Sequence, residues 1–290
     1  MGPPRERSER RREHGTSPLA WLAAELLLVP EYSRSVTDQP VRALYPQANS
    51  VEDFAHNLAD VRAHIAAAAE RSGRDAAGIR LLSVSKTVPE ERLLLAIQAG
   101  AVDLGENKVQ EAQRKAENLA DQDVRWSVIG HLQTNKAKDV VAFADEFQAL
   151  DSIRLADALD RRLQAAGRSL DVFVQVNTSA EESKFGLEPS DALAFLEEMQ
   201  HRDSLRVQGL MTLALFTSDT ERVRECFRIL RDLRDQARER DLVGPGGLSM
   251  GMSGDYQAAI EEGATVVRVG QAIFGARRTP DSEYWPGFAK

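Results

Sequence analysis

The sequence predicts an α/β protein, a single-domain (β/α)8 TIM barrel with an extra N-terminal helix. Eight short apolar runs alternate with helical patterns along the chain. Several runs, such as DVFVQVN and TVVRVG, are almost continuous in apolar, mostly β-branched residues, as expected for strands that are buried on both faces of a parallel sheet. The 290 residues fit one barrel of roughly 250 residues and leave too little for a second core.

The first 49 residues differ from the rest of the chain. The basic run RERSERRREHG precedes the apolar run PLAWLAAELLLVP, an order that is typical of secretory signals. However, Glu25 interrupts the apolar run, no small-residue cleavage site follows at once, and the run is shorter than the roughly 20 residues that span a bilayer. We expect residues 1–49 to be a poorly ordered extension or an overextended start, residues 50–280 to form the barrel, and residues 281–290 to form a tail.

A helix is predicted between Ser50 and Gly73. The Ser50 hydroxyl can cap its start together with Asp53, and apolar residues recur at helical spacing until Gly73 stops the helix. This helix precedes the first strand and would cover the bottom or the flank of the barrel.

The eight strands follow in order along the chain. Helical patterns such as RLADALDRRLQAAG separate them, and several of these patterns end at a glycine that can form a C-cap. The predicted strands cover residues 80–86, 103–107, 125–130, 146–151, 171–177, 207–213, 247–252 and 266–270.

Composition narrows the range of partners. The chain holds 45 acidic and 37 basic residues, so nucleic acid is not expected to bind its anionic surface. Cys226 is the single cysteine, which excludes an intramolecular disulfide and favours a cytoplasmic location. The five histidines are scattered, so no metal site is predicted, and no membrane partner is expected.

Lys86 ends the first predicted strand, where the strand ends of a barrel face a shared mouth. It shares a strand face with Leu82 and Val84, and partial burial would lower its pKa from about 10.4. A neutral amine attacks aldehydes, and the aldehyde that proteins most often hold in this way is pyridoxal phosphate (PLP). A surface lysine that happens to follow a strand is the alternative, and position alone does not separate the two.

Polar residues recur at other strand ends, where each alone could be an ordinary turn residue. They are Asn107, His131, Asn177 and Lys184. Their recurrence favours a functional mouth.

The last two strands predict a phosphate site, because the loops that follow them commonly bind phosphate in barrels. Gly270 lets an anion approach the backbone, the amides of Gly270 and Gln271 can donate to it, and Ser253 adds a hydroxyl. Alternatively, the glycines here only make tight turns.

Arg268 shares a strand face with Gly270 between valines, where a guanidinium needs hydrogen-bond acceptors. The ring nitrogen of PLP could be one such acceptor. Because arginine keeps its proton, the ring nitrogen would then stay unprotonated and the cofactor would be a poor electron sink. A structural arginine paired with a carboxylate is the alternative.

Several motifs now occur together: SVSKT with Lys86, GENKVQE, WSVIGHLQTNKAK, QVNTSAEESKFG, GLMTL, LSMGMSGDYQAAIEEG and VRVGQAIFG. From about Ser50 to Arg278 the chain resembles the YggS/PROSC family of pyridoxal phosphate homeostasis proteins. The resemblance implies a fold-type III PLP-binding barrel, similar to the N-terminal domain of bacterial alanine racemase. It also implies these cofactor contacts: Lys86 as the Schiff-base lysine, Asn107 beside the cofactor, Ser249, Ser253, Gly270 and Gln271 around the phosphate, and Arg268 at the ring nitrogen. Gln271 departs from the threonine that is common there.

The resemblance implies an intracellular, non-catalytic carrier or buffer of this vitamin B6 cofactor, expected to be monomeric and to serve apo PLP-dependent enzymes. The alternative is a weak amino-acid racemase. Two-base racemisation needs a second acid or base, which alanine racemases take from another domain, and we expect none here, although Tyr256 lies near the mouth. Ser83 to Lys86 also spells S-x-x-K, but the partner motifs of penicillin-recognising hydrolases are missing.

Overall fold

The computed structural model describes residue 2 and residues 45–276, and the fold is that of residues 45–276. Eight parallel strands form a closed barrel in chain order, with β1 paired to β8. The strands are β1 (Arg80–Val84), β2 (Asp103–Glu106), β3 (Arg125–Val128), β4 (Glu146–Leu150), β5 (Leu170–Gln175), β6 (Leu205–Met211), β7 (Gly247–Ser249) and β8 (Val266–Val269). The predicted fold class is confirmed.

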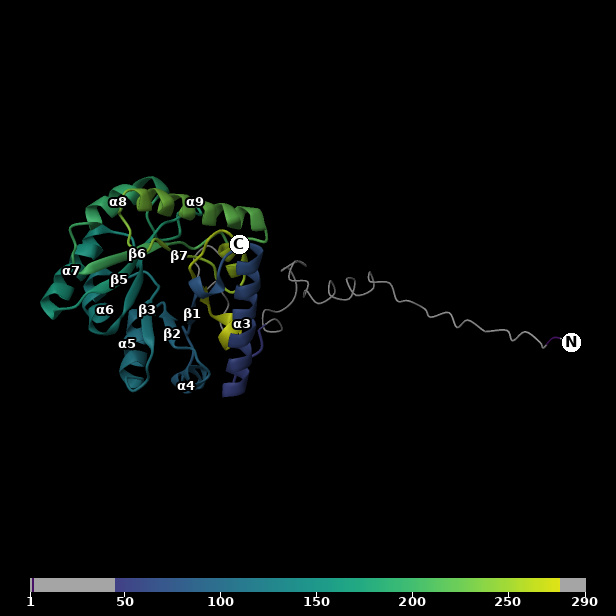
Figure 1. Cartoon of the computed structure of the whole chain (residues 1–290). Helices are drawn as coiled ribbons and strands as arrows, with labels where there is room; N and C mark the ends of the chain where they lie inside the picture. The colour runs from purple at the N-terminus through teal and green to yellow at the C-terminus, as the bar shows by residue number, and fades with distance from the viewer. Residues whose placement is uncertain (1, 3–44, 277–290) are drawn as a thin grey trace. The chain divides into compact units, whose positions relative to one another are not determined.

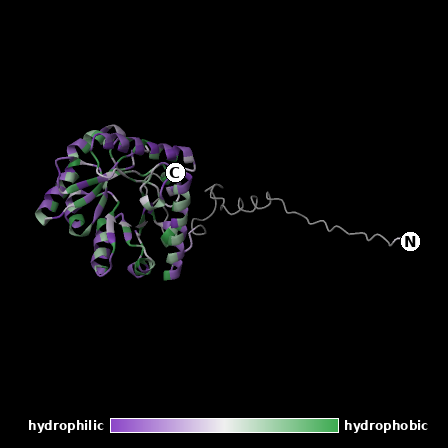
Figure 2. Cartoon of the chain, in the orientation of Figure 1, coloured by the Kyte–Doolittle hydropathy of each residue, from purple (hydrophilic) through white to green (hydrophobic). Residues whose placement is uncertain are grey.

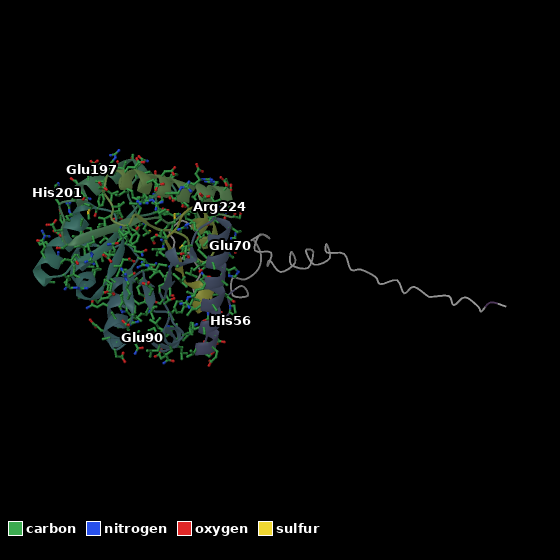
Figure 3. All side chains as sticks on the ribbon, viewed as in Figure 1. His56, Glu70, Glu90, Glu197, His201 and Arg224 are labelled. Carbon is green, nitrogen blue, oxygen red and sulfur yellow. The ribbon has the colours of Figure 1, made fainter. Side chains whose placement is uncertain are left out.

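Helices surround the strands (Figure 1). They are α3 (Val51–Arg71), α4 (Glu90–Gln98), α5 (Val109–Asn118), α6 (Ala137–Phe143), α7 (Ile153–Ala166), α8 (Ala192–Met199), α9 (Thr220–Glu239), α10 (Tyr256–Glu261) and α11 (Gln271–Phe274). Charged residues such as Glu70, Glu197 and Arg224 lie on these outer helices (Figure 3). None of the helices within residues 45–276 is long and apolar enough to cross a membrane.

The predicted N-terminal helix is present as α3. The Ser50 hydroxyl accepts from the Asp53 amide, and the Asp53 carboxylate accepts from the Ser50 amide, which completes the predicted capping box. Helix α3 packs against α4, α10 and α11, and the Phe54 ring meets the Phe274 ring edge to face at 5.7 Å. The helix therefore covers the flank of the barrel, one of the two predicted positions.

The described chain begins before the predicted boundary at residue 50. Ala48 is buried, its carbonyl accepts from Arg92, and the Ala276 amide donates to the Tyr45 carbonyl at 2.9 Å. Residues 45–49 thus pack on the barrel, because their carbonyl groups accept hydrogen bonds from α4 and from the last described residue. Residue 1 and residues 3–44 of the predicted extension, and the tail predicted from residue 281, lie outside the described residues.

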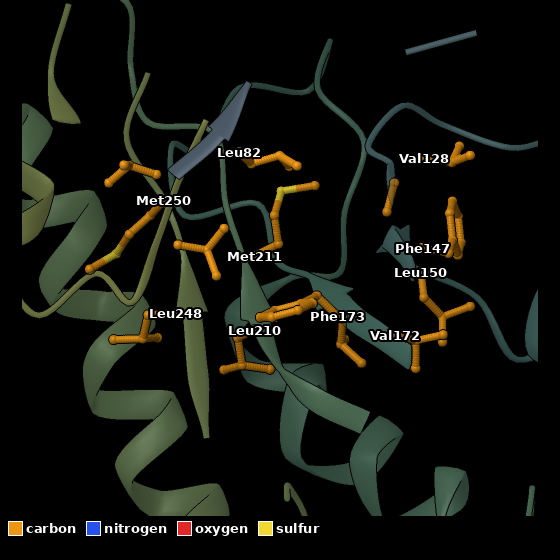
Figure 4. Packing of buried hydrophobic residues seen from close by; sticks show 14 of the residues in the cluster. Leu82, Val128, Phe147, Leu150, Val172, Phe173, Leu210, Met211, Leu248 and Met250 are labelled. Atoms are coloured by element: carbon orange, nitrogen blue, oxygen red, sulfur yellow. The ribbon is translucent and has the colours of Figure 1, made fainter. Parts of the chain in front are cut away.

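The core is largely apolar and includes Leu82, Phe173 and Met211 among its buried residues (Figure 4). The outer helices turn apolar faces inward and carry hydrophilic residues outside, as α9 does (Figure 2). Cys226 is buried on the inner face of α9.

The amino-terminal end of the barrel is charged rather than apolar. Arg80 donates to the buried Glu146 at 2.6 Å, and Arg125 donates to Asp171 at 3.0 Å. Residues at the strand starts therefore form ion pairs at this end of the barrel. From Glu146 a series of buried polar side chains leads toward the opposite end.

Candidate functional site

Lys86 lies just beyond the end of β1, in a turn that leads to α4. The strand ends at Val84, two residues before its predicted end, because the Val88 amide bonds back to the Ser85 carbonyl at 3.0 Å. Lys86 is buried, with only 7% of the residue exposed. Thr87 follows with φ 67, a left-handed conformation that is costly for a β-branched residue. Such strain next to a buried lysine is typical of functional sites.

A buried ionic cluster holds this turn on both sides of Lys86. Lys115 on α5 donates to the Ser85 carbonyl at 2.9 Å, to Glu106 at 2.7 Å and to Glu111 at 2.8 Å. Glu106 also accepts from the Ser85 hydroxyl at 2.7 Å, while Glu111 accepts from the Thr87 amide at 2.9 Å. Burial raises the pKa of Glu106, which Lys115 opposes. The cluster therefore fixes the residues that flank Lys86.

Strand register aligns Asn107 with Lys86. Val84 pairs with Gly105 between β1 and β2, and Lys86 and Asn107 each follow by two residues. The Asn107 backbone also approaches β3 closely, because a Cβ on Gly130 would lie 2.1 Å from the Asn107 carbonyl oxygen. The structure thus brings two of the predicted site residues to neighbouring strand ends.

The predicted phosphate residues converge after β8. The Ser253 hydroxyl accepts from the Gly270 amide at 3.2 Å and from the Ala272 amide at 3.5 Å. A Cβ on Gly270 would lie 3.1 Å from the Val84 carbonyl oxygen, so this cradle adjoins the strand that carries Lys86. Gln271 is half-buried at the start of α11.

Asp255 fastens the loop that carries Ser253. Its carboxylate accepts from the Met252 amide at 2.5 Å, and its own amide donates to the Met252 carbonyl at 3.1 Å. Burial raises the pKa of Asp255, although the Met252 amide and the nearby Arg268 charge oppose this. The hydroxyl of Ser253 is therefore presented by a closed, self-bonded loop.

Arg268 is buried in the barrel, with 3% of its surface exposed. It donates to the Ser249 hydroxyl at 2.7 Å and to the Thr212 carbonyl at 2.7 Å. Burial lowers the pKa of Arg268 to about 10. Among the described residues its hydrogen-bond partners are neutral, and the nearby charge of Asp255 opposes the effect of burial on its pKa. Ser249 is thus placed beside Arg268, whereas the prediction grouped it with Ser253.

The other polar strand-end residues form a rim around the mouth. His131 stacks on Phe185 at 3.8 Å between ring centroids, and its Nδ1 lies 3.5 Å from Asp151. Burial raises the pKa of Asp151, and His131 opposes this. Asn177 bonds within its own loop, and Lys184 donates to the Ala214 carbonyl at 2.8 Å. The Asn177 bond stays within the loop after β5, and the Lys184 bond joins this loop to the one after β6.

Sequence reasoning missed several residues that support the site: Glu106, Glu111, Lys115, Gln148 and Thr212. Two signals were available. Glu111 and Lys115 are four residues apart on one helix, a spacing that pairs charges, and Gln148 is polar inside the buried run EFQAL. No group of His, Cys, Asp and Glu side chains within residues 45–276 could hold a metal ion.

Comparison with known proteins agrees with this geometry. Residues 50–278 match the family described as alanine racemase, N-terminal domain. A pyridoxal phosphate homeostasis protein from Aquifex aeolicus is 41% identical over 221 residues, covering 76% of this chain and 97% of the relative. The protein of that name from Escherichia coli is 39% identical over 232 residues, covering 78% of this chain and 98% of the relative.

Solved structures extend the comparison. PipY from Synechococcus elongatus, solved with PLP bound, is 32% identical with a TM-score of 0.67, covering 77% of this chain and 100% of PipY. Alanine racemase from Streptomyces lavendulae, at 19% identity and a TM-score of 0.61, covers 80% of this chain and 59% of the racemase, and shares the fold alone. The chain therefore belongs to the family of pyridoxal phosphate homeostasis proteins.

Proposed function

We propose that this protein binds pyridoxal 5'-phosphate through a Schiff base on Lys86 and acts as a carrier or buffer of the cofactor. The observation that supports this proposal best is the arrangement of three unlike groups at one end of the barrel. They are a buried lysine, a cradle of amides and a hydroxyl, and a buried arginine.

The donor set fits PLP at each of its reactive ends. The Lys86 amine can condense with the aldehyde, forming a C=N bond and releasing water. The Gly270 and Ala272 amides and the Ser253 hydroxyl suit an anionic phosphate, with Gln271 at the start of the same turn. Asn107, aligned with Lys86 by register, would lie beside the cofactor.

Arg268 supports a holding role rather than catalysis. When bound, PLP supplies an aldehyde and a ring that withdraws electrons best when its nitrogen is protonated. With a pKa of about 10, Arg268 stays a donor at neutral pH and keeps a facing ring nitrogen unprotonated. The names of the relatives, which concern homeostasis of pyridoxal phosphate, agree with such a role.

An absorbance spectrum with and without borohydride tests the proposal. The parent protein should bind PLP with a band that borohydride removes, leaving a mass label on the peptide that holds Lys86. Lys86→Ala should lose both signals, whereas the control Lys184→Ala, which changes a half-buried lysine of the loop after β5, should keep them. A borohydride-trapped label in Lys86→Ala would contradict the assignment.

A weak fold-type III racemase is the second candidate, favoured by the buried Tyr256, which starts α10 next to the Ser253 loop. We expect no racemisation of amino acids at high protein concentration. Activity that Tyr256→Phe abolishes would replace the carrier role. A cytoplasmic location, a monomeric state and transfer to apo PLP-dependent enzymes remain predictions.

A further inference from the structure

A chain of buried hydrogen bonds crosses the barrel from Arg268 to Glu146, which lies at the charged amino-terminal end. Arg268 Nη1 donates to Ser249 Oγ at 2.7 Å, and Ser249 Oγ donates to Gln148 Oε1 at 2.7 Å. Gln148 Nε2 then donates to Glu146 Oε1 at 2.5 Å. At most 3% of any of these four residues is exposed, so water does not compete for the bonds.

The direction of every bond in this chain is fixed by chemistry. The Glu146 carboxylate can only accept, so Gln148 must turn its amide nitrogen to it and its carbonyl to Ser249. The carbonyl can only accept, so the Ser249 proton points to Gln148. A lone pair of Ser249 is then left for Arg268, which can only donate.

The far end of the chain is anchored independently. Glu146 also accepts from Arg80 at 2.6 Å and from the Ser127 hydroxyl at 2.9 Å, so its carboxylate does not depend on Gln148 for its position. Arg268, by contrast, has one further protein bond, to the Thr212 carbonyl, among the described residues. These bonds use two of its five N–H donors.

We propose that Gln148 is a positioning residue for the cofactor ring, because it orients Ser249 so that the remaining donors of Arg268 are held toward the ring nitrogen of PLP. The inference rests on the proposed function and extends it to a residue of the opposite strand β4. Among residues 45–276 the side chain of Gln148 bonds to Glu146 and Ser249 and not to the cradle around Ser253, so we expect its effect at the ring end of the site.

Two variants with a matched control test this role through the dissociation constant of PLP. Gln148→Met removes both hydrogen bonds at similar volume, and we expect binding roughly 5- to 10-fold weaker, the loss of about one hydrogen bond. The near-ultraviolet absorbance of bound PLP should shift as well, because Arg268 no longer fixes the ring nitrogen. Ser127→Ala removes a different bond to the same Glu146 carboxylate and should change neither quantity.

The conservative variant Gln148→Glu separates positioning from packing. The introduced carboxyl still accepts from Ser249 and shares one proton with Glu146, because two adjacent carboxylates do not both ionise. Because the hydrogen-bond pattern is intact in this variant, its dissociation constant for PLP should lie within about twofold of the parent value. The absorbance maximum of bound PLP should match that of the parent. If Gln148 only fills space, Gln148→Glu, which buries a new carboxyl group, should bind PLP more weakly than Gln148→Met.

A double-mutant cycle with Ser249→Ala completes the test. If Gln148 acts through Ser249, the double variant binds PLP no more weakly than Ser249→Ala alone. Additive losses, or a Gln148→Met variant with parental affinity and spectrum, would overturn the inference. Both outcomes differ from failure of the proposed function itself, in which the parent protein would not bind PLP at all.

Discussion

Single residues in this site owe their positions to groups that never touch the candidate ligand. The turn at Lys86 carries Thr87 in a left-handed conformation, which costs on the order of 1–3 kcal/mol. Lys115 offsets this cost, since its three donors connect the Ser85 carbonyl, Glu106 and Glu111 in one buried cluster. The position of Lys86 therefore depends on the ionic group Lys115, which lies on the neighbouring helix α5.

Lys115→Met is accordingly expected to be far more harmful than a surface substitution. It leaves Glu106 buried without its charge partner, and breaking such a pair costs about 3–5 kcal/mol of unfolding free energy. Urea unfolding measures the loss. The double variant Glu106→Gln with Lys115→Met should recover part of it by removing the orphaned charge, and a double variant as unstable as the sum of the singles would contradict this.

Ser253→Ala tests the phosphate cradle. A hydrogen bond to a charged group contributes about 1.5–3 kcal/mol, so PLP binding should weaken by roughly 10-fold or more. Pyridoxal, which has no phosphate, should bind the variant and the parent equally. Ser179→Ala removes a hydroxyl that bonds inside the loop after β5 and serves as the control. Equal losses for both ligands would place the phosphate elsewhere.

At the scale of whole elements, the close approach of strand ends limits which residues the mouth tolerates. A Cβ on Gly130 would lie 2.1 Å from the Asn107 carbonyl oxygen, so β2 and β3 must separate to admit a side chain. Gly130→Ala should cost about 1–3 kcal/mol through overpacking and should weaken PLP binding by moving Asn107. Calorimetry and PLP titration measure the two effects.

Gly78→Ala provides the comparison for Gly130→Ala. A Cβ at Gly78 would meet no atom within 4 Å, so neither stability nor PLP affinity should fall. If Gly130→Ala also leaves stability and PLP affinity unchanged, the close contact between the ends of β2 and β3 does not contribute to function.

The strands and the strand-end residues were predictable because each depends on local pattern. Alternation of strands and helices predicts a barrel, and a barrel places Lys86, Asn107 and Gly270 at one end whatever its register. The ring end of the site was only partly predictable. Arg268 is visible as a charge between valines, but its partner Ser249 and the link to Gln148 depend on which residues face each other across the barrel.

The pairing of Lys115 with Glu106 was hidden for a different physical reason, although the i,i+4 spacing of Glu111 and Lys115 was visible. Lys115 follows Val109 and Ala112 on the buried face of α5, at spacings that suggest core packing. From the sequence, a lysine at such a position suggests the solvent-exposed edge of the helix. Its buried partner is the carboxylate of Glu106 on β2, which only the structure shows. Long side chains that satisfy one another across elements leave little periodic signal in the sequence.

For the whole molecule, PLP should act as a stabilising ligand, because the candidate contacts join β1, the loop after β7 and the start of α11. Closing contacts between the first and last strands adds free energy to the folded state only, so the barrel as a unit gains stability. At a PLP concentration of 100 times the dissociation constant the gain is about 2.7 kcal/mol, or roughly 5–10 °C in Tm for a domain of this size.

A thermal scan of the parent with and without PLP measures this gain. Lys86→Ala should lose most of the shift because the covalent bond is gone, yet keep a residual shift from the phosphate cradle. Adding Ser253→Ala to Lys86→Ala should then remove the remaining shift in Tm. If the single variant Lys86→Ala is stabilised as much as the parent, PLP binds the folded barrel without the lysine, and the covalent link contributes nothing to the stability of the whole molecule.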